Sequence, residues 1–213
     1  MNDEHNLIPE TVENLVVLCH GYGSNGADMA ELARELVGDF PRTAFLTPDA
    51  PVAVGWGGYE WFNLDDFDLT TADETYLDTL TARAAGVADE VVAWVQEAMA
   101  RWHLSPNQVV LGGFSQGGLV AFRAAQTLGA AGVIGLSAVP VGKITRAEKP
   151  FPILLTHGEA DPVVPDVAWQ VGVAHLRMAG YPVKTVKVPN LGHGVDEVCL
   201  NAVKKFLRQV EKP

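Results

Sequence analysis

The chain has 213 residues, of which 48% are hydrophobic and 19% are charged. A chain of this length and composition can bury one substantial core, which excludes a disordered or fibrous protein. Its 26 acidic and 15 basic side chains give a net charge of −11 without a basic cluster, so binding to nucleic acid or to anionic membranes is disfavoured.

The first residues are polar and acidic, and no segment has the run of about 18 apolar residues that a membrane span requires. Cys19 and Cys199 are too few for a disulfide framework, and both lie in apolar patterns typical of buried thiols. These features predict a cytoplasmic protein without membrane insertion.

Short apolar runs typical of buried strands alternate with longer segments in which apolar residues recur at helical spacing. In chain order we expect strand 15–19, helix 27–37, strand 43–46, a glycine- and aromatic-rich loop 47–69, helix 71–102, strand 107–112, helix 117–128, strand 132–136, strand 153–156, helix 165–179, strand 183–188 and helix 195–210. Uniformly apolar strands joined by helices predict an α/β fold, with a mostly parallel central sheet covered by helices on both faces. A single domain is expected over residues 1–213.

The first glycine-rich loop reads Gly-Tyr-Gly-Ser-Asn-Gly and lies between a strand and a helix. It matches the G-x-G-x-x-G pattern of dinucleotide-binding loops, with Asp49 after the next strand as a candidate ribose-binding acid. An oxidoreductase that binds a dinucleotide through Gly21, Gly23 and Gly26 is therefore a remote alternative. It is weakened by His20 at the strand end and by the Pro-Asp-Ala-Pro turn around the aspartate.

A second motif, Gly-Phe-Ser-Gln-Gly, places Ser115 between an expected strand and an expected helix. That setting is the one in which G-x-S-x-G forms a nucleophile elbow. Glycines on both sides let strand and helix approach closely, and the tight turn projects the serine hydroxyl above the sheet. We therefore interpret Ser115 as a catalytic nucleophile rather than as an ordinary helix N-cap.

A serine hydroxyl needs a general base, and the base needs an orienting acid. In this architecture both follow the nucleophile, the acid first and the histidine last. His193 lies in a glycine-flanked loop after the last expected strand, whereas His175 lies within a helix and His157 ends a strand. His193 is therefore the predicted base.

Asp161 is the predicted acid, because it follows a core strand and leaves room for one strand–helix unit before His193. Glu159 and Asp166 lie in the same segment and remain alternatives. Asp166 is better interpreted as the N-cap of the helix that it precedes, as is Asp196 for the last helix.

Acyl transfer places negative charge on a carbonyl oxygen, which backbone N–H groups held in advance can stabilise. One donor is expected from Gln116, directly after the nucleophile, and the other from an early strand–helix loop. Tyr22 in the first glycine loop is the predicted second donor. The glycines of that loop would then cradle an oxyanion in place of a pyrophosphate.

Four motifs occur in order at fitting separations: Leu-Cys-His-Gly-Tyr-Gly ending at Gly23, Gly-Phe-Ser-Gln-Gly-Gly around Ser115, His-Gly-Glu-Ala-Asp-Pro-Val-Val-Pro around Asp161, and Gly-His-Gly around His193. Together they resemble the phospholipase/carboxylesterase family of α/β-hydrolases, which holds small bacterial carboxylesterases and the acyl-protein thioesterases. The resemblance covers nearly the whole chain, from about residue 14 to residue 207.

The resemblance implies an α/β-hydrolase fold without a separate lid domain and a reaction that needs no cofactor. It carries the nucleophile, acid and base to Ser115, Asp161 and His193, and the oxyanion donors to Tyr22 and Gln116. The aromatic-rich segment 54–62 looks closer to that of bacterial esterases than to that of eukaryotic thioesterases.

The predicted protein is a serine hydrolase that cleaves carboxylic esters with small to medium acyl chains through an acyl-enzyme. The alternative within the same family is an acyl-protein thioesterase or lysophospholipase. Trp61, Phe62, Leu64 and Val164 are the candidate walls of the acyl site, although packing of a long loop would explain the aromatic residues equally well. No metal is expected, because H-x-H and H-E-x-x-H are absent from the sequence. The expected partner is a small-molecule ester or thioester, and the expected state is a monomer or homodimer.

Overall fold

The computed structural model describes residues 4–64, 74–146 and 148–211. In this part of the chain, six strands form one parallel sheet and two shorter strands form a separate antiparallel hairpin. The strands of the sheet are β1 (Asn14–Cys19), β2 (Thr43–Leu46), β5 (Val109–Phe114), β6 (Gly132–Leu136), β7 (Ile153–Gly158) and β8 (Val183–Val188). Their spatial order is β2-β1-β5-β6-β7-β8. The α/β fold with a mostly parallel sheet is thereby confirmed.

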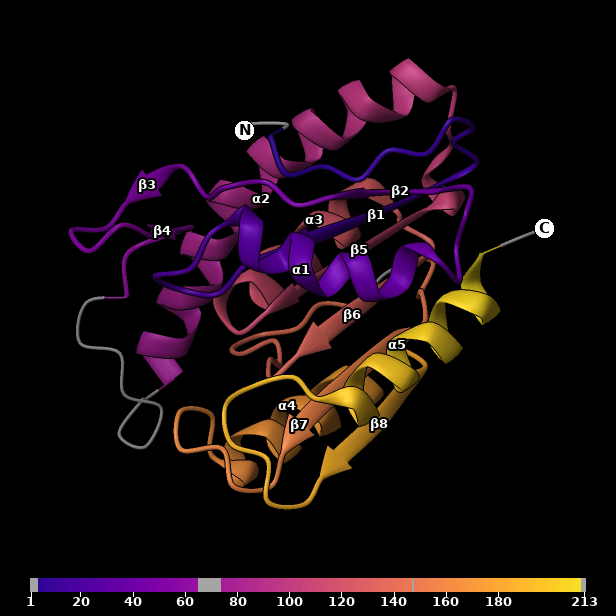
Figure 1. Ribbon diagram of the computed structural model, residues 1–213. Coiled ribbons are helices and arrows are strands. Elements are labelled where there is room, and N and C mark those ends of the chain that lie inside the picture. Colours follow the sequence, from indigo (N-terminus) through magenta and orange to yellow (C-terminus); the bar gives the residue numbers. More distant parts are fainter. Residues whose placement is uncertain (1–3, 65–73, 147, 212–213) are drawn as a thin grey trace.

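Helices cover both faces of the sheet (Figure 1). The helices of the described residues are α1 (Gly26–Val37), α2 (Glu74–Trp102), α3 (Gln116–Leu128), α4 (Asp166–Met178) and α5 (Glu197–Val210). In Figure 1, α1 and α5 lie on the near face, while α2, α3 and α4 lie on the far face. The α2 and α3 helices also pack against each other on that far face.

The sequence produces two cores because alternate residues of a strand point to opposite faces of the sheet. In β1, Leu15 and Val17 face the core beneath α2, α3 and α4, whereas Val16 and Leu18 face the core beneath α1 and α5. All six residues of β1 are buried. A strand buried on both faces has an uninterrupted apolar sequence, which is why its apolar run predicted it.

Differences from the sequence-based prediction are concentrated between β2 and α2. The loop expected over 47–69 contains the hairpin of β3 (Val52–Ala53) and β4 (Tyr59–Glu60), which pairs antiparallel. Strands of two residues are too short to produce an alternating pattern, so no local pattern predicts them. The helix expected from residue 71 is described from Glu74, and residues 65–73 lie outside the described ranges.

The two predicted helix caps have different outcomes. Asp196 is the N-cap of α5, and its carboxylate accepts a hydrogen bond of 2.9 Å from the Cys199 N–H. The prediction for Asp166 is wrong, because the N-cap of α4 is Pro165 and Asp166 is the first helical residue. Its carboxylate instead forms an ion pair of 2.6 Å with Lys187 of β8.

Cys19 and Cys199 are free and buried, as the sequence predicted. Burial raises the pKa of the Cys19 thiol to about 12, which keeps it protonated and unreactive at neutral pH. None of the helices in the described residues is long and apolar enough to cross a bilayer.

Candidate active site

Ser115 lies at the carboxyl end of β5, in the turn that leads directly into α3. Its backbone has φ 49° and ψ −118°, a left-handed conformation that costs free energy for a residue with a side chain. The Ser115 N–H donates to the Leu136 carbonyl at 3.0 Å, which fixes the turn against β6. This is the strained strand–turn–helix geometry that the Gly-Phe-Ser-Gln-Gly motif predicts.

The glycines on either side of Ser115 are required by close backbone contacts. A Cβ on Gly113 would overlap the backbone of Gly117, and a Cβ on Gly117 would overlap the carbonyl oxygen of Cys19. The elbow therefore sits tightly between β1 and α3, and only glycine fits at these two positions.

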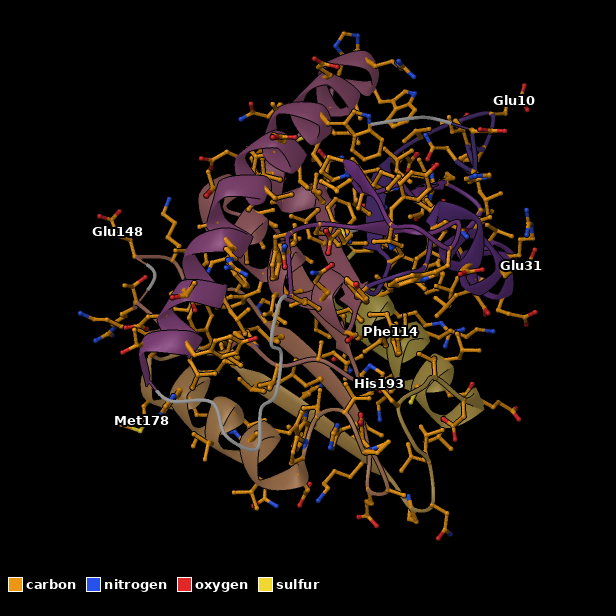
Figure 2. The ribbon with its side chains drawn as sticks, turned by 90° about the vertical axis from the view of Figure 1, so that its left-hand side faces the viewer. Glu10, Glu31, Phe114, Glu148, Met178 and His193 are labelled. Carbon is orange, nitrogen blue, oxygen red and sulfur yellow. The ribbon has the colours of Figure 1, made fainter. Side chains whose placement is uncertain are left out.

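His193 lies in the loop between β8 and α5, and its Nδ1 is 2.8 Å from Oδ2 of Asp161. A carboxylate accepts hydrogen bonds, so the proton of the neutral imidazole resides on Nδ1 and the lone pair resides on Nε2. Figure 2 shows the ring of His193 beside that of Phe114, with their centroids 4.8 Å apart. Phe114 directly precedes Ser115, so this contact holds the imidazole next to the elbow.

The carboxylate of Asp161 is fully buried and held at both oxygens. Its Oδ1 accepts hydrogen bonds from the N–H groups of Val163 and Val164, at 2.8 and 2.9 Å. Its Oδ2 faces His193. These contacts fix the orientation of the acid.

The alternatives for the acid and the base lie elsewhere or have other contacts. Glu159 is exposed, and Asp166 is paired with Lys187. His175 is exposed on α4. His157 is the exception: it is fully buried, with its Nδ1 3.7 Å from Oδ2 of Asp161.

Ser115 and His193 line the same cavity, which has a volume of about 290 Å³. Three of the four predicted wall residues, Phe62, Leu64 and Val164, also line it. The remaining cavity residues include apolar side chains of α2, α3 and the segment after β6, which the sequence reading did not single out: Leu80, Leu119, Val139 and Val141. The cavity therefore has a mostly apolar wall, and Ser115 and His193 are among its polar members.

Trp61, the fourth predicted wall residue, does not line the cavity. Its side chain is 1% exposed, and its indole N–H donates to the carbonyl of His20 at 2.8 Å. The indole also packs on the His20 ring, with centroids 5.3 Å apart. Trp61 is therefore a packing residue that holds the aromatic-rich loop onto β1.

The two predicted oxyanion donors lie at the cavity, and both residues line it. Gln116 is the first residue of α3, where a backbone N–H has no carbonyl partner within the helix. The side chain of Gln116 has a second role that the sequence did not indicate. Its Oε1 accepts a hydrogen bond of 2.9 Å from the backbone N–H of Trp61, and its Nε2 donates to the Phe62 carbonyl at 2.6 Å.

The loop that carries Tyr22 is braced by the hairpin and by His20. The Gly23 N–H donates to the Tyr59 carbonyl at 2.9 Å, which joins this loop to β4. The Nε2 of His20 accepts from the Ala50 N–H at 2.9 Å, so its Nδ1 carries the proton and donates to the Gly21 carbonyl at 2.7 Å. Burial lowers the pKa of His20, which keeps this bridging imidazole neutral.

These contacts also bear on the dinucleotide alternative. A pyrophosphate would need free N–H groups in the glycine loop. The N–H of Gly23 is bonded to Tyr59, and that of Gly26 donates to the Asp49 carboxylate at 2.7 Å. The Asp49 carboxylate therefore binds the N-terminus of α1 itself and is not placed to bind a ribose. Within the described ranges, no group of three or more histidine, cysteine or acidic side chains is placed to hold a metal ion.

Several known proteins are similar to this chain. Acyl-protein thioesterase 1 of Gibberella zeae is 34% identical over 118 residues, which are 51% of this chain and 50% of that protein. A probable carboxylesterase, SOBER1-like, of Arabidopsis thaliana is 26% identical over 91% of this chain and 78% of its own length. Among solved structures, esterase PE8 superposes with a TM-score of 0.85 at 29% identity, covering 96% of this chain and 97% of that one.

A sequence profile described as Phospholipase/Carboxylesterase matches residues 9–211. The match spans nearly the whole chain and includes the elbow, the acid loop and the histidine loop. It agrees with the similarity to the solved structure of esterase PE8, which also extends over nearly the whole chain. The chain belongs to the phospholipase/carboxylesterase family of α/β-hydrolases.

Proposed function

We propose that the protein is a serine carboxylesterase that hydrolyses carboxylic esters with small to medium acyl chains. One observation carries the proposal: a histidine whose Nδ1 proton is held by a buried carboxylate shares an apolar cavity with a serine on a strained elbow. That combination leaves a basic nitrogen and a nucleophilic oxygen in a site suited to an acyl chain.

In the proposed reaction, Ser115 attacks the ester carbonyl while Nε2 of His193 accepts the hydroxyl proton. The carboxylate of Asp161 holds the imidazole in the required tautomer and stabilises the imidazolium. The backbone N–H groups of Tyr22 and Gln116 stabilise the oxyanion. The imidazolium then protonates the leaving alcohol, and a water molecule, deprotonated by His193, hydrolyses the acyl-enzyme.

The size of the cavity supports the preference for small to medium acyl groups. Ligand pockets have volumes of roughly 300–1,000 Å³, and this cavity of about 290 Å³ is at the lower end. The described residues of its wall are mostly apolar and would accept a hydrocarbon chain. In a series of p-nitrophenyl esters from acetate to palmitate, kcat/KM should therefore reach its maximum at an acyl chain shorter than the longest ones tested.

A thioesterase is the second candidate, because the relatives include proteins named acyl-protein thioesterase 1. Octanoyl thioester and octanoyl oxygen ester should be compared at the same enzyme concentration. A kcat/KM ratio that favours the oxygen ester supports the carboxylesterase, and a ratio that favours the thioester supports the alternative.

Replacement of the nucleophile tests the mechanism. Ser115→Ala should lower kcat by roughly 10⁴- to 10⁶-fold while thermal unfolding stays cooperative, because the hydroxyl is the atom that forms the acyl-enzyme. Fluorophosphonate should label the wild-type protein at Ser115 and leave the variant unlabelled. Near-normal turnover by Ser115→Ala, or a label mapped to another residue, would refute the assignment.

A further inference from the structure

His157 is the last residue but one of β7 and lies directly beside the proposed acid. Its side chain is fully buried, and Nδ1 is 3.7 Å from Oδ2 of Asp161. That oxygen is the one that accepts the hydrogen bond from His193. Two imidazoles therefore face a single carboxylate oxygen, one at 2.8 Å and the other at 3.7 Å.

No hydrogen bond within the described part of the chain explains why a polar ring is buried at position 157. Neither of its nitrogen atoms has a hydrogen-bond partner among the described residues. Buried polar groups in folded proteins are nearly always paired, so each unpaired one requires a specific reason. A phenyl ring would fill the same space without that cost.

Packing fixes the plane of this ring. The ring stacks on Trp169 of α4, with centroids 5.0 Å apart and an interplanar angle of 11°. Because the stack prevents the ring from tilting, packing also fixes the position of Nδ1 relative to the Asp161 carboxylate.

Burial and the surrounding charges act on the pKa of His157 in different directions: burial, Lys187 and His193 lower it, whereas Asp161 and Asp166 raise it. Asp161 and Asp166 face it from the acid loop and the start of α4, Lys187 from β8, and His193 from the following loop. Burial has the largest effect and lowers the pKa of His157, so the ring is neutral at pH 7. With a neutral ring, the tautomer with the proton on Nδ1 places the positive end of the N–H dipole nearest Asp161. The other tautomer would place a lone pair there.

We propose that His157 is a positioning residue that acts through the acid: its neutral imidazole directs the Nδ1–H dipole at Oδ2 of Asp161 and so sets how strongly this carboxylate acts on His193. The role presupposes the triad proposed above. It assigns His157 no contact with substrate. Its effect on catalysis passes entirely through the strength of the Asp161–His193 hydrogen bond.

The direction in which loss of this dipole shifts the pH profile can be predicted. The positive end of an N–H bond near Asp161 offsets part of the negative charge that stabilises the His193 imidazolium. Without it, the imidazolium becomes more stable, and the acid limb of the kcat/KM profile moves to higher pH by about 0.5 unit or more. A residue that only filled space would change stability and leave that limb in place.

The test compares pH profiles of kcat/KM for three variants. His157→Phe keeps a ring on Trp169 and removes the donor, so its acid limb should move to higher pH. His157→Asn keeps an N–H near the position of Nδ1, so its acid limb should stay near that of the wild type. Trp169→Phe, the matched control, loosens the packing but retains the imidazole, and its limb should not move.

Two outcomes overturn the proposal: an unshifted limb in a folded His157→Phe variant, or equal shifts in the Phe and Asn variants. Nitrogen-15 NMR of the wild-type imidazoles provides a readout that needs neither turnover nor a folded variant. It should show the His157 proton on Nδ1 between pH 6 and pH 8, and a proton on Nε2 would also overturn the proposal. Failure of the wild type to react with fluorophosphonate would instead contradict the proposed function.

Discussion

Gln116 illustrates how one residue can serve the site in two ways. Its backbone N–H is the proposed oxyanion donor, and its position after the nucleophile made that role predictable from the sequence. Its side chain bridges the Trp61 N–H and the Phe62 carbonyl, and Phe62 lines the cavity. This second role depends on two segments more than 50 residues apart in the chain, so no local pattern could indicate it.

Gln116→Ala separates these roles, because the variant keeps the backbone N–H and loses the bridge. We expect the free energy of unfolding to fall by about 1–3 kcal/mol, since a buried N–H and a buried carbonyl lose their partners. KM should rise most for the longer acyl esters, because Phe62 is no longer held in the cavity wall, while kcat changes less.

Gln126→Ala is the matched control for this experiment. Gln126 lies on the same helix and donates to the Tyr181 hydroxyl at 2.9 Å, and it does not line the cavity. Urea unfolding should show a loss of stability in both variants, whereas a rise in KM is expected only for Gln116→Ala. Equal KM values in the two variants would show that the bridge does not shape the cavity.

At the scale of helices and strands, the sequence predicted the bounds of some strands and misplaced the ends of others. The predicted bounds of β2, β6 and β8 are confirmed. The expected strand 107–112 begins two residues later, because Pro106–Gln108 forms a short 3-10 helix before β5. The strand expected to end at residue 156 continues to Gly158, because His157 and Gly158 pair with β8, which sequence patterning cannot reveal.

Helix caps provide a test at this scale. Asp196→Ala should lower the free energy of unfolding by about 1 kcal/mol, because the carboxylate that accepts from the Cys199 N–H at the start of α5 is lost. Asp166→Ala is the matched comparison, and removal of its partly exposed ion pair with Lys187 should cost only about 0.5 kcal/mol or less. Guanidinium unfolding would measure both, and a larger loss for Asp166→Ala would contradict the cap assignment.

At the scale of the whole molecule, the parallel sheet explains why the proposed catalytic residues could be found from their order in the chain. Ser115, Asp161 and His193 follow β5, β7 and β8, and the carboxyl ends of parallel strands meet at one edge of the sheet. The order of residues along the chain could not predict which helix side chains line the cavity. Leu80 and Leu119 reach it from α2 and α3, whose packing is a property of the folded chain.

The same burial that shapes the site makes the molecule sensitive to acid. His20 and His157 are both fully buried, and burial lowers the pKa of each below its ordinary value of 6.5. His20 also needs its lone pair, because its Nε2 accepts a hydrogen bond from Ala50. When the pH falls below about 6.5, the unfolded chain therefore binds protons at these two positions that the folded chain does not.

Stability should consequently decrease as the pH falls from 7.5 to 5.5. Each imidazole that stays neutral in the folded state contributes a loss of up to about 1.4 kcal/mol per pH unit below 6.5. Urea unfolding in 0.15 M salt, where surface charges more than about 8 Å apart are largely screened, would isolate this contribution from the overall charge of the molecule.

His157→Phe should have a shallower pH dependence of stability than the wild type, because one of the two buried imidazoles is gone. His175→Gln, a change on the exposed face of α4, should retain the full dependence. A wild-type stability that is constant between pH 7.5 and pH 5.5 would mean that the folded protein accommodates charged imidazoles at both buried positions.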